Sequence, residues 1–292
     1  MSETHEPTAK EEVAEIVKGG SKFFLRGSGS LKQFSVRSEE ESYPTILLEG
    51  LNGIIDFSPN DQVVNVRAGT RLSDVGFELE KHGQSIPYLN LYEGFQTKVG
   101  EGTVGGSLSM NLPHFLEREC GTWRDWILGL TVILADGTIC KSGSHAVKSV
   151  AGYDVHKLFV GARGTLGVVT EVILRTYPSE SLPKMETDDN WHVPRTETDR
   201  LCFHRVTAKD YEEAWSNARE FYSWGVPKTS TILVWLPPDR DLPRFPGDQL
   251  IRSGCGAKNL ELTDPIQIKL MKRAKQIFDP TNKLNPGEWG FM

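Results

Sequence analysis

Short apolar segments recur along residues 8–178, and their spacing predicts strands that alternate with helices. A capping box at 8–11 is followed by apolar positions on one helical face, and Gly19 and Gly20 end this first helix. A second helical stripe begins at Leu72. Continuous or alternating apolar runs predict strands at 23–25, 46–48, 53–57, 63–67, 127–135 and 168–177. We therefore expect an α+β domain over 8–178.

The pattern changes after Pro178. Residues 179–200 are polar and predict a linker, and apolar runs predict strands at 201–206 and 231–236. A stripe at helical spacing between these strands predicts a helix packed on the core rather than a cofactor-binding surface: Tyr211, Ala214, Trp215, Ala218, Phe221 and Tyr222. We expect a small α+β second lobe over 179–264.

Two further helices are predicted from their first residues. Asp154 can cap a short helix that turns Val155, Leu158 and Phe159 inward. Asp264 and Pro265 are typical of an N-cap and a first helical residue. The helix that they begin is expected to face inward with Ile266, Leu270, Met271, Ala274 and Ile277. This helix and the tail after it form a third segment, 265–292.

Composition narrows the class of protein. The chain has 292 residues, 38% of them apolar, which suits two folded units with a real core. A net charge of −6 disfavours a nucleic-acid-binding protein. The polar N-terminus lacks a signal core, and the longest near-apolar run, 126–135, is too short to span a bilayer. We expect a cytoplasmic protein, associated with a membrane only through partners.

The four cysteines are scattered, and none forms a CxxC pair. We therefore expect no metal site and no iron–sulfur cluster on this chain, and we expect reduced, mostly structural thiols. The four are Cys120, Cys140, Cys202 and Cys255.

Three glycine-rich segments carry the candidate chemistry. They lie at 26–30, directly after a predicted strand, at 100–111, directly before a predicted helix, and at 161–167. Glycine lets a backbone approach a ligand closely, and successive N–H groups can converge on an anion. The second segment lacks the lysine of a GxxxxGK[ST] phosphate loop. Each segment taken alone is also explained by an ordinary turn.

Taken together, several motifs resemble the FAD-binding domain of the vanillyl-alcohol oxidase / p-cresol methylhydroxylase flavoprotein family. The similarity covers about 8–178 and resumes at the C-terminal tail, which implies that the tail returns to the FAD-binding domain. The motifs are RGSGS at 26–30, GTVGGSLSMN at 102–111, GTWRDWILGL at 121–130, ADG at 135–137, VKSVAGYD at 147–154, GARGTLGVVTE at 161–171 and FDPTNKLNPG at 278–287.

The resemblance implies which residues hold the cofactor. The first two loops are expected to bind the FAD pyrophosphate through backbone amides and hydroxyls: Arg26, Gly27, Ser28, Gly29 and Ser30, then Gly102, Thr103, Val104, Gly105, Gly106, Ser107, Ser109, Met110 and Asn111. The third loop is expected to line the adenosine and ribityl parts: Gly164, Thr165, Gly167, Val168 and Val169. Lys148, Tyr153 and Asp154 are expected near the same cavity, where Lys148 is equally well explained as a surface lysine.

Three departures from the family pattern are informative. No histidine lies in the first loop, and Cys120 and Cys140 lie outside the loops expected to touch flavin, so non-covalent FAD is expected, with Cys120 as the weak point. Arg163 stands where an apolar residue is common, and Ser28 where a glycine is common. The second lobe is smaller than the family's substrate-binding domain.

Within the family, the chain most resembles flavoproteins that oxidise 2-hydroxy acids of the glycolate type. Such a reaction on a CH–OH group needs a cation for the carboxylate and a base for the hydroxyl proton. The sequence identifies no catalytic base, since each candidate is more simply explained as a surface or packing residue: His156, His192, Arg195, His204 and Arg205.

The lack of cluster cysteines, with the resemblance, implies an oxidase complex with a second flavoprotein subunit and an iron–sulfur subunit. Two alternatives remain open. The chain could be a non-catalytic FAD-binding or scaffolding subunit whose small lobe is an interaction surface, or a free-standing FAD oxidase of another alcohol.

Overall fold

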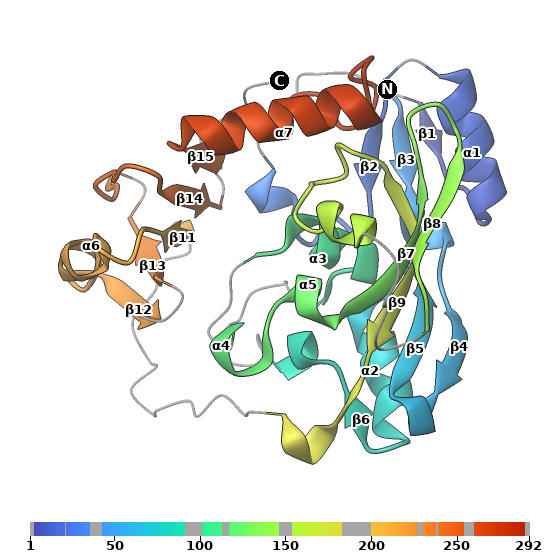
Figure 1. The fold of residues 1–292 in the computed structure, drawn as a ribbon, viewed down its shortest axis with the longest axis horizontal. Coiled ribbons are helices and arrows are strands. Elements are labelled where there is room, and N and C mark those ends of the chain that lie inside the picture. Colours follow the sequence, from blue (N-terminus) through green and yellow to red (C-terminus); the bar gives the residue numbers. More distant parts are fainter. Residues whose placement is uncertain are drawn as a thin grey trace.

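An antiparallel five-stranded sheet of order β4-β5-β9-β7-β8 forms the centre of the N-terminal part (Figure 1). The computed structural model describes residues 3–20, 22–35, 43–90, 101–112, 117–145, 154–182, 200–226, 230–237, 239–253 and 260–289. The strands of the sheet are β4 (Ile54–Ser58), β5 (Val63–Arg67), β7 (Ile127–Ile133), β8 (Ile139–Gly143) and β9 (Val168–Arg175).

Helices cover this sheet because each buries one apolar stripe. The helix α1 (Lys10–Gly19) packs Val13 and Val17 against the end of β7. The helices α2 (Leu72–Glu80) and α3 (Val104–Met110) contribute to the main core. Beside them lie the short helices α4 (Glu117–Cys120) and α5 (Trp123–Trp126) and the antiparallel pair β6 (Gln84–Ser85) and β10 (Tyr177–Pro178).

A small parallel sheet of order β1-β3-β2 precedes the main sheet in the chain. Its strands are β1 (Thr4–His5), β2 (Phe24–Arg26) and β3 (Thr45–Leu47). The first glycine loop leaves the end of β2, so this sheet sets the position of that loop.

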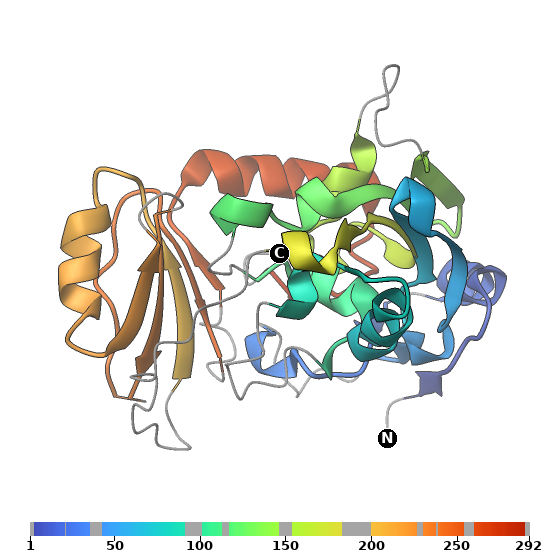
Figure 2. The same cartoon turned by 90° about the horizontal axis from the view of Figure 1, so that it is seen from below.

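The second lobe is an antiparallel sheet of order β12-β13-β11-β14-β15 with α6 (Tyr211–Ala218) on its outer face (Figure 2). Alternate residues of its strands serve two cores, because successive side chains point to opposite faces. Cys202 and Val234 pack toward α6, whereas Phe203 and Trp235 join the core of the N-terminal part. The strands are β11 (Arg200–Arg205), β12 (Tyr222–Val226), β13 (Thr231–Leu236), β14 (Gln249–Arg252) and β15 (Leu260–Leu262).

The helix α7 (Pro265–Phe278) runs from β15 back to the N-terminal part (Figures 1 and 2). Asp264 is its N-cap, accepting a hydrogen bond from Ile266 N at 2.8 Å, as the sequence predicts. The expected inward face is confirmed for Met271 and Ala274 and wrong for the other three residues: Ile266, Leu270 and Ile277 are 68%, 61% and 68% exposed. The face that packs on the core is Met271, Ala274, Lys275 and Phe278.

The predicted α+β class is confirmed, and three local expectations are corrected. Glu12, not Glu11, completes the first capping box, accepting from Thr8 N at 2.8 Å. The segment after Asp154 is a 3₁₀ turn, η6 (Val155–Leu158), that exposes both its first and last residues and buries His156. Tyr222 begins the strand β12 rather than continuing α6.

The exposed apolar stripe of α7 gives a stability prediction. Leu270→Gln and Ile277→Gln should each change the free energy of unfolding by less than about 0.5 kcal/mol, because neither side chain leaves water on folding. Phe278→Ala should lower it by roughly 2 kcal/mol, because the Phe278 ring lies 5.5 Å from the Phe159 ring at the core. Urea unfolding of the three variants distinguishes them, and a large loss for Leu270→Gln contradicts this orientation of α7.

Candidate functional site

The first and second glycine loops are in direct contact. A Cβ on Gly27 would overlap Thr103 Oγ1, so only glycine fits at this approach. Ser28 Oγ donates to Glu101 O at 3.3 Å. Gly29 has φ +77°, and a Cβ there would lie 2.8 Å from Arg26 Nη2. The loop therefore folds back under the Arg26 guanidinium and against the start of α3.

The two loops differ in how their backbone N–H groups are used. The amides of 104–107 are all bonded within the protein; their acceptors are, in order, Thr70 O, Ala68 O, Thr103 Oγ1 and Thr103 O. For the amides of 27–31, no acceptor is found in the part of the chain that the structure describes. The expectation that both loops offer amides is thus not met at 104–107, and the free donors lie in the first loop.

The third loop joins the opposite end of α3. Gly161 N donates to Leu108 O at 3.1 Å, and Arg163 N donates to Ser109 O at 2.9 Å. Gly161 and Gly164 have φ +75° and +70°, which a side chain would strain. All three glycine loops therefore meet around one short helix, although more than 130 residues separate the first from the third.

Several other predicted site residues lie inside the protein. Val104, Val168 and Val169 are buried in the cores, and Met110 packs against the main core. A Cβ on Gly167 would lie 2.9 Å from the Phe159 ring. Gly102 accepts from Leu72 N, Thr165 Oγ1 donates to Ala162 O at 2.6 Å, and Asn111 takes the left-handed conformation at the end of α3.

The remaining predicted site residues are not joined to the loops by any described contact. Asp154 is exposed and pairs with Lys157 at 2.9 Å. Lys148 and Tyr153, like the candidate catalytic residues His192 and Arg195, lie outside the described residues.

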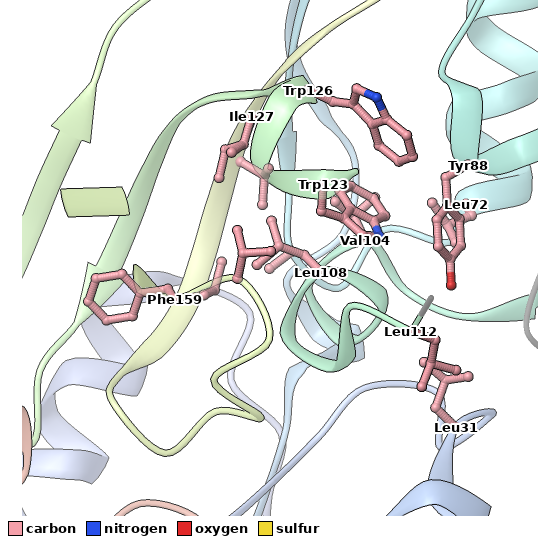
Figure 3. Packing of buried hydrophobic residues seen from close by; sticks show 14 of the residues in the cluster. Leu31, Leu72, Tyr88, Val104, Leu108, Leu112, Trp123, Trp126, Ile127 and Phe159 are labelled. Atoms are coloured by element: carbon pink, nitrogen blue, oxygen red, sulfur yellow. The ribbon is translucent and has the colours of Figure 1, made fainter. Parts of the chain in front are cut away.

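Buried polar atoms near α3 test whether the site suits a polar cofactor. Ser107 Oγ on α3, Trp123 Nε1 and Arg163 Nη2 are buried and find no hydrogen-bond partner among the described residues. The Trp123 indole lies beside Val104 and Leu108 of α3 and 4.9 Å from the Tyr88 ring (Figure 3). Buried polar atoms usually have partners, so unpaired donors around α3 and the third loop fit a ligand rich in oxygen and nitrogen, as FAD is.

His204 belongs to the core of the lobe rather than to this site. It faces α6, and its Nε2 lies 2.8 Å from Asp248 Oδ2; both side chains are essentially buried. Burial lowers the pKa of His204, although Asp248 opposes this shift. Arg244 also donates to Asp248, and these hydrogen bonds outweigh burial and lower the pKa of Asp248 to about 2.

Arg205 and His156 also have structural partners. Arg205 makes two hydrogen bonds to the Glu117 carboxylate, at 2.8 and 2.9 Å, and so ties the lobe to α4. His156 Nδ1 lies 3.2 Å from Ser142 Oγ on β8, and burial lowers its pKa. None of the described candidates is therefore free to act as a base on a substrate at the glycine loops.

Cys120 is a poor nucleophile. Burial, together with Glu119 and Glu117, raises the pKa of its thiol to about 12. A covalent bond to flavin through this sulfur would need the thiolate, which is scarce at neutral pH.

Two residues that no sequence motif marked as site residues connect the loops to the C-terminal part of the chain. Asn285 bonds both β2 and the third loop, and Lys275 bonds the third loop from α7. Nothing in the sequence predicts that Lys275 of α7 or Asn285 of the tail is buried, because both residue types usually lie at the surface. The motif FDPTNKLNPG at 278–287 was the one sequence feature that pointed to the tail.

Comparison with known proteins identifies two family models in the chain. A model described as FAD binding domain matches residues 4–143, and one described as FAD linked oxidases, C-terminal domain, matches residues 257–289. Glycolate oxidase subunit GlcE of Escherichia coli (strain K12) is 31% identical over 96% of this chain and 87% of its own length.

Other relatives match only part of their own length. Glycolate oxidase subunit GlcD of Bacillus subtilis (strain 168) is 32% identical over 48% of this chain and 28% of its own. D-lactate dehydrogenase of Anaerostipes hadrus is 30% identical over 60% of this chain and 36% of its own. The chain thus spans about a third of the length of these two relatives.

No described helix has the length and apolar character needed to cross a bilayer. No group of three or more His, Cys, Asp or Glu side chains in the described ranges is placed to hold a metal ion.

The contacts of Asp248 predict how the lobe responds to acid. Its pKa lies below the ordinary 3.8, so the carboxylate stabilises the folded lobe above pH 4 and loses that stabilisation as pH falls through about 2. The contribution is about 2 kcal/mol at neutral pH. Urea unfolding of wild type and Asp248→Asn should show a gap that narrows between pH 5 and 2; a gap independent of pH contradicts this assignment.

The approach of Gly27 to Thr103 predicts the effect of one methyl group. Gly27→Ala should push the first loop away from α3 and weaken FAD binding at least about a hundredfold, because about 3 kcal/mol of contacts depend on that approach. Gly19→Ala is the matched control, since a Cβ there meets nothing within 4 Å. Fluorescence titration with FAD measures both; equal affinities for the two variants would refute the placement of the cofactor at this loop.

Proposed function

This chain belongs to the FAD-linked oxidase family with a vanillyl-alcohol oxidase / p-cresol methylhydroxylase-type FAD-binding domain, and we propose that it is the FAD-binding subunit of a 2-hydroxy-acid dehydrogenase complex of the glycolate type. One observation carries the proposal. The similarity to the glycolate oxidase subunit of E. coli runs through 96% of the chain and so includes the small second lobe. Longer relatives match about half of the chain.

Bound FAD would supply the redox chemistry, by accepting the two electrons released when a CH–OH group is oxidised. The chain's own residues bind and orient it. The amides of 27–31, for which the described residues provide no acceptor, and the Arg26 guanidinium are suited to the pyrophosphate, while Ser107 and the third loop would supply further polar contacts. The buried core around Trp123, Val104 and Leu108 packs against α3 and holds it in place.

We propose that the FAD is held without a covalent bond. The raised pKa of Cys120 keeps its sulfur protonated, and its neighbours Glu117 and Glu119 oppose a thiolate. The first loop contains no histidine, so it offers no imidazole to which the flavin could be attached.

The division of the chain follows from this role. We propose an FAD-binding domain over 8–178, a shortened substrate or cap lobe over 179–264, and a helix and tail over 265–292 that return to the FAD-binding domain. Electrons would leave through a second flavoprotein subunit and an iron–sulfur subunit, with the complex in the cytoplasm and reaching a membrane only through those partners.

A second candidate function, a non-catalytic FAD-binding subunit, is favoured by one observation. The lobe face that meets the N-terminal part is built of apolar side chains, among them Phe203, Leu233 and Trp235. Arg205, on the same strand as Phe203, is already paired with Glu117. This face offers no described base for the hydroxyl proton of a substrate.

A visible spectrum of the purified chain tests the proposal. The protein should be yellow, and acid precipitation should leave the flavin in the supernatant because no covalent bond holds it. Cys120→Ser should bind FAD as the wild type does. Colourless protein that does not take up added FAD contradicts the proposal. Reduction of the flavin by glycolate with the partner subunits present supports the catalytic role, and no reduction under those conditions supports the non-catalytic one.

A further inference from the structure

The C-terminal tail is built into the strand that leads to the first glycine loop. Phe23 N donates to Lys283 O at 2.8 Å, and Asn285 N donates to Phe23 O at 3.0 Å. The Asn285 side chain then accepts from Leu25 N at 2.7 Å. The tail thus lies alongside the start of β2 and bonds its backbone, immediately before the loop at 26–30.

The same asparagine also holds the third loop. Asn285 Nδ2 donates to Arg163 O at 2.7 Å, and a Cβ on the adjacent Gly164 would lie 2.7 Å from that nitrogen. The two ends of one amide therefore bond backbone groups that lie 138 positions apart in the chain, Leu25 and Arg163 (163 − 25). A side-chain amide suits this role because its oxygen accepts and its nitrogen donates.

Glu288 adds a second tie between the same segments. Its carboxylate lies 2.9 Å from Arg163 Nη1 and accepts from Ser35 Oγ at 2.6 Å. Arg163 Nη1 also donates to Phe34 O at 2.8 Å. The Arg163–Glu288 ion pair is buried on both sides, with side chains 3% and 5% exposed.

These contacts close a ring. The first loop touches Thr103 at the start of α3, the end of α3 holds the third loop through Leu108 and Ser109, and the tail joins the third loop back to β2. A ring holds its members at fixed spacing better than an open series of contacts, because each loop is restrained from two sides. Changing the Asn285 side chain removes the contact that joins the third loop directly to β2, while Lys275 and Glu288 still bond the third loop.

We propose that the tail segment 283–288 is a clamp that sets the affinity of the chain for FAD, with Asn285 as the positioning residue. It acts through the first and third loops, by holding them at the spacing that the cofactor spans. The inference rests on the proposed function, since it takes FAD as the ligand. Because coupling is reciprocal, bound FAD should in turn hold the tail in place.

The test is Asn285→Asp in the full chain, with FAD titrated by fluorescence. Aspartate keeps the acceptor for Leu25 N and loses the donor to Arg163 O, so the dissociation constant should rise at least about tenfold. Asn217→Asp is the matched control, since Asn217 lies half-buried on α6, away from the glycine loops, and donates within that helix, to Glu213 O at 2.8 Å. Its dissociation constant should stay within about twofold of the wild type.

Hydrogen exchange separates positioning from general destabilisation. Without FAD, the amides of 161–167 should exchange faster in Asn285→Asp than in the wild type, while those of β11 and β13 in the lobe keep their wild-type rates. Saturating FAD should slow exchange at both 161–167 and 283–288. Faster exchange spread through the lobe, or FAD affinity unchanged within about twofold, overturns the clamp.

A second variant and the wild-type affinity itself complete the test. If Asn285→Asp does not fold, Glu288→Gln takes its place; the glutamine keeps the shape but removes the charge facing Arg163, and FAD affinity should fall about three- to tenfold. An unchanged affinity in Glu288→Gln overturns the clamp. If the wild type itself binds no FAD, the proposed function fails and the clamp with it, whereas wild-type binding with unaffected variants overturns the clamp alone.

Discussion

The buried ammonium of Lys275 fixes the relation between the C-terminal helix and the rest of the molecule. Its three protons are all used, by Asp279 Oδ2 at 2.6 Å and by the carbonyl oxygens of Thr165 and Leu284, each at 2.8 Å. Burial lowers its pKa, and Asp279 opposes that shift. A buried charge is tolerated only with such complete pairing, so this contact dictates how α7 is rotated and where the tail begins.

That anchor explains why the orientation of α7 could not be predicted from its apolar pattern. Apolar residues of α7 lie on two faces, and the sequence gives no reason to bury the one that carries Lys275. The helix turns Leu270 and Ile277 outward because the ammonium must reach its partners. By contrast, the cap at Asp264 and the strand 63–67 depend on local rules, and both were predictable.

The arrangement of the glycine loops, too, could be predicted from the sequence only in part. Their spacing and residue types predict close backbone approaches, and the structure brings all three around α3. The sequence does not tell which loop retains free donors, because the acceptors for 104–107 come from the distant turn at 68–70 and from the cap residue Thr103. In the lobe, β14 was missed because Arg252, although buried, is charged and is bonded by Asp241 and Glu261.

The charge of the chain makes the local geometry of the first loop decisive. A protein with a net charge of −6 repels a diphosphate at long range, although salt screens that repulsion beyond roughly 8 Å. Short-range donors must therefore provide the attraction, and a row of amides with a guanidinium folded over Gly29 provides it only while the loop keeps its shape. That shape depends on Thr103 on one side and on β2 on the other. The proposed anion site is consequently only as well formed as the contacts that hold β2, and those contacts include residues near the end of the chain.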